Sequence, residues 1–358
     1  MLKYHANILQ FYKNFVSLLK IYVVKLDMRI LIDSDIPYIK GILEPYCDVE
    51  YIKGTEFNRE NVSRCDALIV RTRTKCNELL LSGSNVKVIA TATIGTDHID
   101  LDFCERHGIK VYNAKGCNAR GVLQWVAATL QHITHNDKKQ PSDYTLGVVG
   151  VGAVGSLVSK YARHWGFNIM ECDPPRMERE GGVYYTIEEL AKGCDILTFH
   201  TPLDKTTHHL LSKELIGIMR PEAVIINASR GGVVDNIAVV NSSHRYYFDV
   251  WENEPNIDTN ILQQSELATP HVAGYSLQGK ANASAMVINH IARYFDLPIH
   301  NWYPTGIERS KEQLIEWDKM CNTIHKYYPI SEESEYLKQH PEQFEEMRNN
   351  YAYRKEYF

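Results

Sequence analysis

The stretch LGVVGVGAVGSLVSKYARHWGFNIMECD, residues 146–173, decides the fold of this chain. A short apolar strand over Leu146–Val149 leads into a glycine-rich turn, an amphipathic helix follows to about Trp165, and a second strand over Phe167–Glu171 ends at Asp173. This order predicts a complete βαβ unit of the kind that binds dinucleotides. A lone G-x-G-x-x-G would be weak evidence, but the flanking strand, helix and acid make the pattern specific.

Each residue of this motif has a physical task. Gly150 permits the tight turn, Gly152 lets a pyrophosphate approach the backbone, and Gly155 lets helix and strand pack closely. Free N–H groups at the helix start, around Val154, face the phosphates. Asp173 ends the second strand, where a carboxylate accepts both ribose hydroxyls and repels a 2′-phosphate. The motif therefore predicts NAD rather than NADP, whereas an ordinary βα turn would leave Asp173 unexplained.

Length and composition restrict the class of protein. At 358 residues the chain is too long for one ordinary compact domain, so two or three are expected. Its 44% hydrophobic and 23% charged residues are typical of a soluble globular protein, and a net charge of −5 gives no reason to expect nucleic-acid binding. The eight cysteines show no C-x-x-C or zinc spacing, which predicts reduced, mostly buried thiols in the cytoplasm and no metal site.

The first 27 residues are apolar but interrupted by lysines. No stretch of the chain reaches the roughly 18 uninterrupted apolar residues that a membrane helix needs, and no small-residue cleavage site follows residue 27. We expect no membrane association. Residues 1–27 are then either the product of a start codon placed too early or an added surface helix, and the sequence does not choose between these.

From Met28 onward, short apolar strands alternate with helices. Strands are expected at Arg29–Ile32, Val49–Ile52 and Ala67–Val70, with a first helix at Tyr38–Leu43. Such alternation predicts parallel sheets covered on both faces. We therefore expect an α/β protein with two doubly wound domains and a helical tail. The expected parts are an N-terminal extension (1–27), a flavodoxin-like substrate-binding domain (28–118), an NAD-binding Rossmann domain (119–275), a helix returning to the first domain (276–300) and a dimerisation segment (301–358).

Polar loops follow the strands of both predicted domains. In the first domain they are VRTRTK, residues 70–75, and the loop from Thr93 to His98. In the second, successive strand ends carry Arg230, Asp249, Glu254 and His271. Ligands of open α/β sheets bind outside the carboxyl ends of the strands, so these loops are the candidate site. The three cations of VRTRTK could hold a phosphate and a carboxylate, although a solvated basic turn is equally compatible with Arg73 and Lys75 individually.

Three of these residues suit the oxidation of an alcohol by hydride transfer. That reaction needs a base for the hydroxyl proton, a cation for the substrate carboxylate and a cofactor that accepts the hydride. His271 is the candidate base because imidazole titrates near neutral pH. Glu254 could fix its tautomer, and Arg230 could bind a carboxylate with two hydrogen bonds. Each alone could be structural, but their shared position beside a dinucleotide motif favours catalysis.

Several longer runs resemble the D-2-hydroxyacid dehydrogenase family over about Met28 to Phe295. They are CDPP (172–175), ILTFHTPL (196–203), INASRGGVVDN (226–236), DVWENEP (249–255) and ATPHVAGYSLQGKA (268–281). Together with GTDHID and GCNA in the first half, they are similar to the branch that oxidises 4-phospho-D-erythronate with NAD to 2-oxo-3-hydroxy-4-phosphobutanoate, in the route to pyridoxal 5′-phosphate (vitamin B6). The resemblance implies an NAD-dependent dehydrogenase that acts on the CH–OH group of a 2-hydroxy acid.

The resemblance also implies roles for individual residues. Arg230, Glu254 and His271 become the active-site residues, with His271 as proton donor in the reductive direction. The implied NAD contacts, besides the glycine motif, are Asp173, Thr201, Ala228, Ser229, Asp249 and Gly274. The implied substrate contacts are Thr72, Thr93 and Tyr275.

The sequence departs from the family pattern in two places. The stretch from Asp235 to Asp249 is several residues shorter than usual, which puts the placement of Asp249 and Glu254 in doubt. The helix after GCNA carries Arg120-Gly121 and Gln124 where small or apolar residues are usual. Two alternatives therefore stay open. One is a dehydrogenase for another D-2-hydroxy acid such as glycerate, and the other is a regulatory NAD-binding protein without catalysis.

The tail beyond Pro304 is charged and aromatic. Helical stretches are expected at Ser310–His325, at Glu332–Lys338 and near Pro341–Asn349. The tail lacks enough apolar sequence for a core of its own, so it should pack against another surface. It resembles the dimerisation segment of the same branch, which implies a homodimer. A monomer in which the tail wraps its own chain is the alternative.

Overall fold

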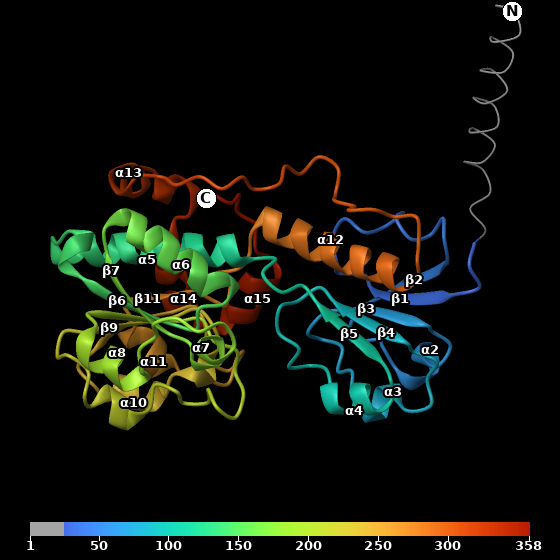
Figure 1. The fold of residues 1–358 in the computed structure, drawn as a ribbon, viewed down its shortest axis with the longest axis horizontal. Coiled ribbons are helices and arrows are strands. Elements are labelled where there is room, and N and C mark those ends of the chain that lie inside the picture. Colours follow the sequence, from blue (N-terminus) through green and yellow to red (C-terminus); the bar gives the residue numbers. More distant parts are fainter. Residues whose placement is uncertain (1–24) are drawn as a thin grey trace, which may run out of the picture. The chain divides into compact units, whose positions relative to one another are not determined.

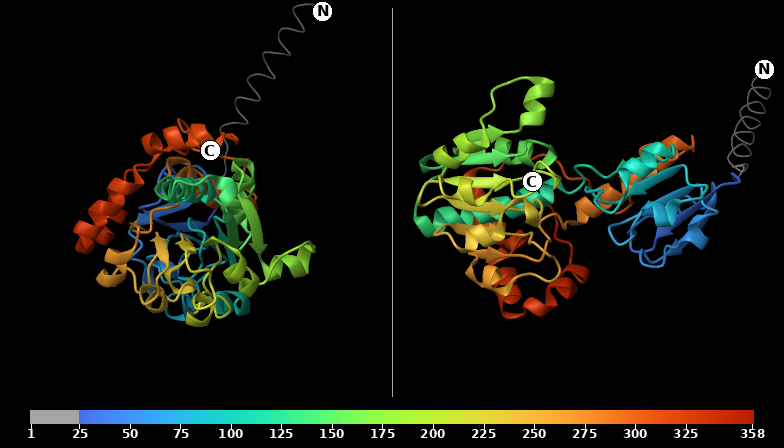
Figure 2. Two further views of the ribbon diagram at one scale, coloured as in Figure 1. Left: turned by 90° about the vertical axis from the view of Figure 1, so that its left-hand side faces the viewer. Right: turned by 90° about the horizontal axis from the view of Figure 1, so that it is seen from below.

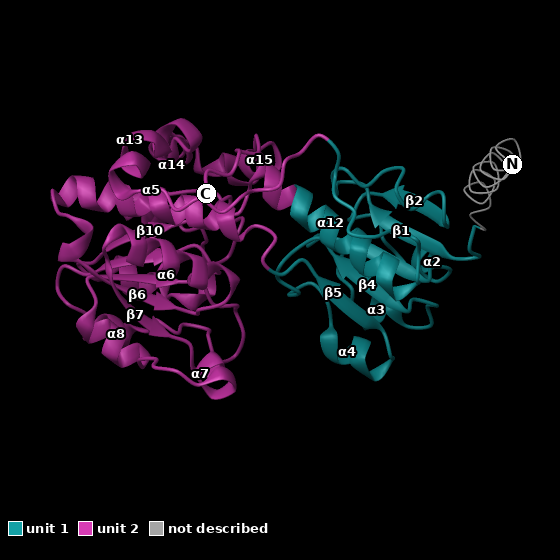
Figure 3. Ribbon diagram, turned by 45° about the horizontal axis from the view of Figure 1, so that its top comes forward, with its two compact units in different colours: residues 1–115, 281–305 teal, residues 116–280, 306–358 magenta. Residues whose placement is uncertain are grey.

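The computed structural model describes residues 25–358, and these form two compact units (Figure 3). One unit comprises the residues up to Lys115 together with Ala281–Thr305, and the other comprises Gly116–Lys280 and Gly306–Phe358. Most of the predicted N-terminal extension lies outside the described residues. The predicted fold class is confirmed, because each unit is built on a parallel sheet and a helical segment ends the chain.

The first unit is a five-stranded parallel sheet. Its strand order is β2-β1-β3-β4-β5, and short helices connect several of the strands. The strands are β1 (Arg29–Asp33), β2 (Asp48–Ile52), β3 (Ala67–Val70), β4 (Val88–Thr91) and β5 (Lys110–Asn113). The helices are α2 (Arg59–Val62), α3 (Glu78–Leu81) and α4 (Leu101–Arg106).

Alternate residues of each strand in this sheet enter different apolar cores. Ile30 and Ile32 of β1 pack in one core cluster, and Leu31 between them packs in another. This follows from the strand period of two, which sends successive side chains to opposite faces. The first core also contains Ile288 and Ile291 of α12 (Leu277–Tyr294), a helix whose residues from Ala281 onward belong to this unit.

The helix predicted at Tyr38–Leu43 is wrong. The structure has a series of turns there, because Tyr38 and Gly41 adopt positive φ values of +69° and +85°. A right-handed helix needs negative φ at every residue. Apolar spacing suggested a helix, but Ile39 and Leu43 reach the core from turns instead.

The second unit is a six-stranded parallel sheet with strand order β11-β10-β9-β8-β6-β7. The strands are β6 (Thr145–Val149), β7 (Asn168–Cys172), β8 (Ile196–Phe199), β9 (Val224–Asn227), β10 (Arg245–Phe248) and β11 (Leu267–Ala268). Its helices are α5 (Ala119–Asp137), α6 (Ala153–Trp165), α7 (Pro174–Glu180), α8 (Ile187–Gly193), α9 (Lys213–Ile216), α10 (Asn236–Val240) and α11 (Thr259–Gln264), with a 3-10 turn η2 at Gly231–Val233.

Helices cover both faces of this sheet. In Figure 1, α5 and α6 lie on one face, and α8, α10 and α11 lie on the other. The two apolar cores follow this division: Trp125 and Tyr161 belong to one, and Leu190 and Ile261 belong to the other. Helix α7 buries none of its residues and projects from the unit (Figure 2). The predicted doubly wound arrangement therefore holds for the nucleotide-binding half.

The tail packs against its own nucleotide-binding unit. It contains α13 (Trp317–Tyr327), α14 (Ile330–Gln339), a 3-10 turn η3 (Pro341–Gln343) and α15 (Phe344–Asn349). Met320 and Ile324 of α13 join the core beneath α5, and Leu337 and Phe344 join the core on the other face. The tail thus completes both cores of a sheet that precedes it in sequence.

Two sequence departures in α5 correspond to close contacts of that helix. The buried side chain of Gln124 donates a hydrogen bond from Nε2 to the carbonyl of Tyr327, at 3.3 Å. At Gly121, an added Cβ would lie 3.3 Å from the carbonyl oxygen of Ala273. The unusual residues therefore match contacts of α5 with the tail and with the 273–274 backbone.

Among residues 25–358, no helix is both long and apolar enough to cross a membrane.

Acid should destabilise the first unit through His98. Burial lowers the pKa of this imidazole from 6.5 to about 4, and Thr91 Oγ1 lies 3.1 Å from its Nε2. The unfolded chain therefore binds one more proton between these values, so His98 costs up to about 3 kcal/mol of stability as the pH falls from about 6.5 to 4. Urea unfolding of the wild type and His98→Asn across this range measures the difference. Parallel pH profiles would contradict the assignment.

Candidate active site

The glycine-rich turn lies where the strand order of the second sheet reverses. Strand β6 has β7 on one side and β8 on the other, which makes its carboxyl end a topological switch point. Gly150 follows β6 with φ of +84°, and an added Cβ there would lie 2.8 Å from Thr201 Cγ2. Only glycine permits this turn next to the end of β8. The turn thus lies at the switch point, where ligands of open α/β sheets bind.

Of the other two glycines, Gly155 allows close packing of the helix and Gly152 leaves space in front of the helix start. A Cβ added at Gly155 would lie 2.0 Å from the carbonyl oxygen of Gly150, so the helix can pack this closely only without a side chain. A Cβ at Gly152 would meet no atom within 4 Å, so space is open in front of the start of α6. Gly152 caps α6 without a side-chain hydrogen bond, and Val154 lies in the first helical turn. The backbone amides of the first turn of α6 are therefore available to an anion.

Asp173 lies at the end of β7 and contacts the glycine-rich turn. Its Oδ2 accepts a hydrogen bond from the amide of Val151 at 2.7 Å, and its Oδ1 accepts one from the amide of Arg176 at 2.9 Å. Arg176 Nη1 in turn donates to the carbonyl of Val151 at 2.6 Å and to Ser156 Oγ at 3.0 Å. Half-exposed Asp173 is thus held beside the turn by hydrogen bonds to two amides.

The polar groups around this turn fit NAD. The buried Thr201 Oγ1 has no hydrogen-bond partner among the described residues, although Thr201 lies beside Gly150. Ala228 and Ser229 follow β9, and Ser229 Oγ donates to Asn227 Oδ1 at 2.8 Å. Open space before a helix start and an acid at the second strand end match a dinucleotide site, and the unpartnered hydroxyl is available to a ligand.

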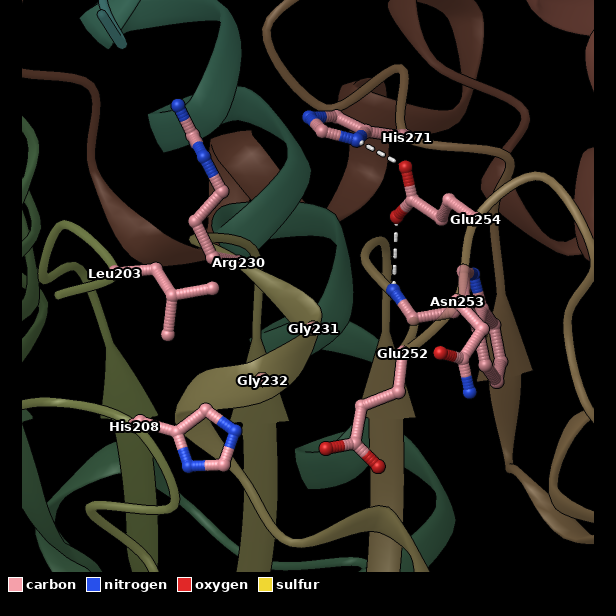
Figure 4. A pocket seen from close by; sticks show the side chains of 10 residues that line it. Leu203, His208, Arg230, Gly231, Gly232, Glu252, Asn253, Glu254 and His271 are labelled. Atoms are coloured by element: carbon pink, nitrogen blue, oxygen red, sulfur yellow. Dashed lines mark hydrogen bonds and ion pairs between the residues drawn. The ribbon is translucent and has the colours of Figure 1, made fainter. Parts of the chain in front are cut away.

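Arg230, Glu254 and His271 line one pocket of about 380 Å³. Figure 4 shows Arg230 on one side and the Glu254–His271 pair on the other. The remaining lining residues are Leu203, His208, Gly231, Gly232, Trp251, Glu252 and Asn253. A Cβ at Gly231 would lie 2.1 Å from the carbonyl carbon and oxygen of Trp251. Arg230 is therefore fixed relative to the segment that carries Glu254, because two backbones touch.

Glu254 and His271 form a hydrogen-bonded pair. His271 Nδ1 lies 2.7 Å from Glu254 Oε2, and Glu254 Oε1 accepts a hydrogen bond from the amide of Trp251 at 2.9 Å. Burial raises the pKa of Glu254, but His271, the Trp251 amide and Arg348 outweigh it, so the net pKa is lowered. The carboxylate is thus ionised at neutral pH. It can orient the imidazole and stabilise its protonated form, while Nε2 stays available to a substrate.

Asp249 anchors the loop that carries His271. Its side chain is buried, with Oδ1 accepting hydrogen bonds from Thr269 Oγ1 at 2.7 Å and the Val272 amide at 2.8 Å. Its Oδ2 accepts one from the Ala273 amide at 3.0 Å. Burial raises the pKa of Asp249, and these donors oppose that shift. The geometry assigns this carboxylate a positioning role, and its predicted contact with NAD stays a prediction.

The shortened stretch before Asp249 still forms a complete strand. Helix α10 ends at Val240, and β10 pairs in parallel with β9 from Arg245 to Phe248. Pairing of Phe248 with Asn227 places Asp249 one residue beyond the ladder. The shortened stretch therefore still brings Asp249 to the end of a regular strand of the sheet.

The other predicted contacts lie outside this pocket lining. Gly274 and Tyr275 follow the His271 loop, and a Cβ at Gly274 would lie 2.0 Å from Asn118 Nδ2. Thr72 and Thr93 belong to the first unit, in loops after the neighbouring strands β3 and β4. Thr72 is exposed, whereas the Thr93 hydroxyl lies 2.6 Å from Thr91 Oγ1. These two substrate contacts stay predictions.

Sequence reasoning missed several residues of the site. His208, His209 and Glu252 form the one group in the described chain that could hold a metal ion. His209 Nε2 lies 2.5 Å from Glu252 Oε1, so a direct hydrogen bond already joins two of the three. Arg348, from the tail, lies 3.8 Å from Glu254 Oε2. Arg348 lies 94 residues from Glu254 in the sequence, so no short motif could contain both residues.

Comparison with known proteins identifies relatives along most of the chain. Residues 118–273 match the model of the D-isomer specific 2-hydroxyacid dehydrogenase NAD binding domain. The erythronate-4-phosphate dehydrogenase of Bacteroides thetaiotaomicron is 42% identical over 340 residues, which cover 92% of this chain and 97% of that protein. The enzyme of that name from Porphyromonas gingivalis is 33% identical over 346 residues, covering 92% and 94%.

Solved structures agree with the fold. The NAD⁺-bound 3-phosphoglycerate dehydrogenase of Entamoeba histolytica matches with a TM-score of 0.65 and 25% identity, covering 80% of this chain and all of that one. The D-lactate dehydrogenase of Aquifex aeolicus, at 24% identity and a TM-score of 0.63 over 78% of this chain and all of that one, shares the fold. The chain therefore belongs to the erythronate-4-phosphate dehydrogenases, a branch of the NAD-dependent D-isomer specific 2-hydroxyacid dehydrogenase family.

Proposed function

We propose that this protein oxidises 4-phospho-D-erythronate with NAD to 2-oxo-3-hydroxy-4-phosphobutanoate, a step toward pyridoxal 5′-phosphate. The observation that carries the proposal is the pocket in which Arg230 faces the Glu254–His271 pair. Relatives that share this chain's length and up to 42% of its residues carry the name of that activity. A protein that only bound NAD would have no need for a base, its carboxylate and a cation in one pocket.

The geometry divides the reaction among three side chains. His271 Nε2 takes the proton of the C2 hydroxyl, since Nδ1 faces Glu254. Glu254 stabilises the imidazolium that forms, and Arg230 holds the substrate carboxylate and polarises the C2 oxygen. NAD, when bound, accepts the hydride from C2. In the reductive direction His271 returns the proton to the oxygen.

The remaining site assignments are part of the same proposal. The glycine-rich turn and the start of α6 hold the pyrophosphate, and Asp173 holds the adenosine ribose. Thr201, Ala228, Ser229, Asp249 and Gly274 complete the NAD contacts, and Thr72, Thr93 and Tyr275 contact the substrate. The basic loop with Arg73 and Lys75, both exposed, suits the phosphate of the substrate. The eight free cysteines support a reducing cytoplasmic location.

The remaining alternatives differ in what they turn over. A dehydrogenase for glycerate would not need the substrate phosphate, and a regulatory protein would bind NAD without turnover. The shortened stretch that favoured the regulatory alternative forms a regular strand, so its main support is removed.

The substrate assay tests the proposal directly. We expect NADH formation with 4-phospho-D-erythronate and NAD, with a 2-oxo acid present as electron acceptor, and little with D-glycerate.

Lys75→Ala should lower kcat/KM for the phosphorylated acid by about tenfold, the value of one charge-assisted hydrogen bond, and leave any glycerate activity unchanged. His271→Asn should abolish turnover while NAD still binds. Equal turnover of both acids would favour the glycerate alternative, and NAD binding without turnover would favour the regulatory one.

Cofactor choice should depend on Asp173. Asp173→Ser retains a cap for α7 but removes the charge that accepts the ribose hydroxyls. We expect kcat/KM with NAD to fall roughly 10- to 100-fold and the preference for NAD over NADP to shrink, because two hydrogen bonds and a repulsion are lost. Glu178→Gln, an exposed change in the same helix, is the control. An unchanged ratio of kcat/KM for the two cofactors would contradict the role of Asp173.

We propose that the protein is a homodimer and that the tail forms the interface. The tail already packs on its own unit, but Leu314, Tyr327 and Tyr336 remain 48%, 40% and 44% exposed. Sedimentation equilibrium should give twice the 41.1 kDa chain mass. Tyr336→Glu should weaken this dimer, and Tyr185→Glu, an exposed tyrosine outside the tail, should not. A wild-type monomer would favour the alternative in which the tail serves only its own chain.

A further inference from the structure

We propose that Arg348, in the tail helix α15, is a positioning residue of the active site. It holds the Glu254 carboxylate and the Tyr275 side chain, and its charge limits how strongly Glu254 stabilises protonated His271. The proposal rests on the proposed function for the reaction that is measured. It makes the tail a part of the catalytic machinery, separate from any role in assembly.

The first observation is the contact with the catalytic pair. Arg348 Nη1 lies 3.8 Å from Glu254 Oε2, the oxygen that also contacts His271 Nδ1 at 2.7 Å. The side chains of Arg348 and Glu254 are 29% and 16% exposed, so water screens their attraction only in part. A cation and an imidazole therefore share one carboxylate oxygen.

The second observation is the electrostatic attraction between Arg348 and Tyr275, the residue four positions after His271. The Tyr275 ring is held on its other sides as well. The Lys280 ammonium lies 3.8 Å from the ring centroid, and the Tyr351 ring meets it edge-on at 5.8 Å. Arg348 thus bridges the segment that carries Glu254 and the loop that carries His271.

The third observation is the attachment of the tail to that loop. Ser276 and Arg354 form a parallel bridge, and the Leu277 amide donates to the Arg354 carbonyl at 2.9 Å. The buried Arg354 guanidinium donates to the carbonyls of Val272, at 3.0 Å, and Ala273. Phe344 at the start of α15 is buried in the core. Both ends of the segment around Arg348 are therefore fixed to the unit that contains the pocket.

The charges around His271 define what removal of Arg348 should do. Glu254 contacts the ring, Asp249 is close enough to interact with its charge, and Arg230, His208 and Glu252 line the same pocket. The two carboxylates favour the protonated form of His271, and Arg348 counteracts them. Its positive charge near Glu254 disfavours a second positive charge on the imidazole. Its loss should make the imidazolium more stable, so the base would stay protonated to higher pH.

The experiment compares Arg348→Gln, Arg348→Met and Arg348→Lys with Lys355→Gln. Lys355 is an exposed cation of the same tail segment and is the matched control. For the two neutral variants we expect the acid limb of kcat against pH to move up by about one unit, as for loss of one nearby charge. Their kcat near neutral pH should fall about tenfold, equivalent to roughly 1.4 kcal/mol, while the Kd for NAD stays within about twofold. Arg348→Lys should return the acid limb of this pH profile to its wild-type position.

Three results would overturn the proposal. They are neutral variants with the wild-type kcat and pH profile, variants that lose NAD affinity together with kcat, and neutral variants that no longer fold. The last two would give Arg348 a structural role only. Failure of the proposed function would appear instead in the wild type, as absence of turnover. In that case the NMR titration of the His271 ring, assigned with His271→Asn, tests the role of Arg348 without turnover. An unshifted titration in Arg348→Gln would refute the electrostatic role.

Discussion

The hydrogen bonds that Asp249 accepts join the end of β10 to the loop that carries His271. A carboxylate that is 1% exposed is stable only when it is paired or bonded, and here the donors come from Thr269, Val272 and Ala273. Thr269 Oγ1 also accepts from Trp125 Nε1 of α5 at 2.8 Å. The end of β10, the loop of His271 and the helix behind the sheet are thereby one connected unit.

This constraint explains how the proposed catalytic residues Glu254 and His271, far apart in the sequence, come within hydrogen-bond distance. His271 adopts φ of +58°, a conformation that a non-glycine residue keeps only when its surroundings enforce it. The loop bonded to Asp249 on one side and to the buried Arg354 on the other supplies that enforcement. The tail is thus integral to the unit that binds NAD, since it also contributes side chains to both apolar cores.

Strands and the glycine motif could be predicted because their signals are local. Leu146–Val149 was expected as a strand and is β6 (Thr145–Val149), and the helix expected after Gly155 is α6. The helix at Tyr38–Leu43 failed for a local reason too, because the apolar spacing did not reveal the positive φ of Tyr38 and Gly41. Ser310–Glu316 was expected to be helical but is irregular, and α13 begins at Trp317.

The sequence by itself determined the two parallel sheets and the dinucleotide motif, because hydrophobic period and glycine spacing are properties of short stretches. The family followed from the resemblance of several longer runs, such as INASRGGVVDN and ATPHVAGYSLQGKA. The sequence also named Arg230, Glu254 and His271, since each follows a recognisable strand. Only the tertiary structure decided that Arg348 reaches Glu254 and that the tail joins the nucleotide-binding unit. Such contacts depend on how segments far apart along the chain pack, and no periodicity within either segment records them.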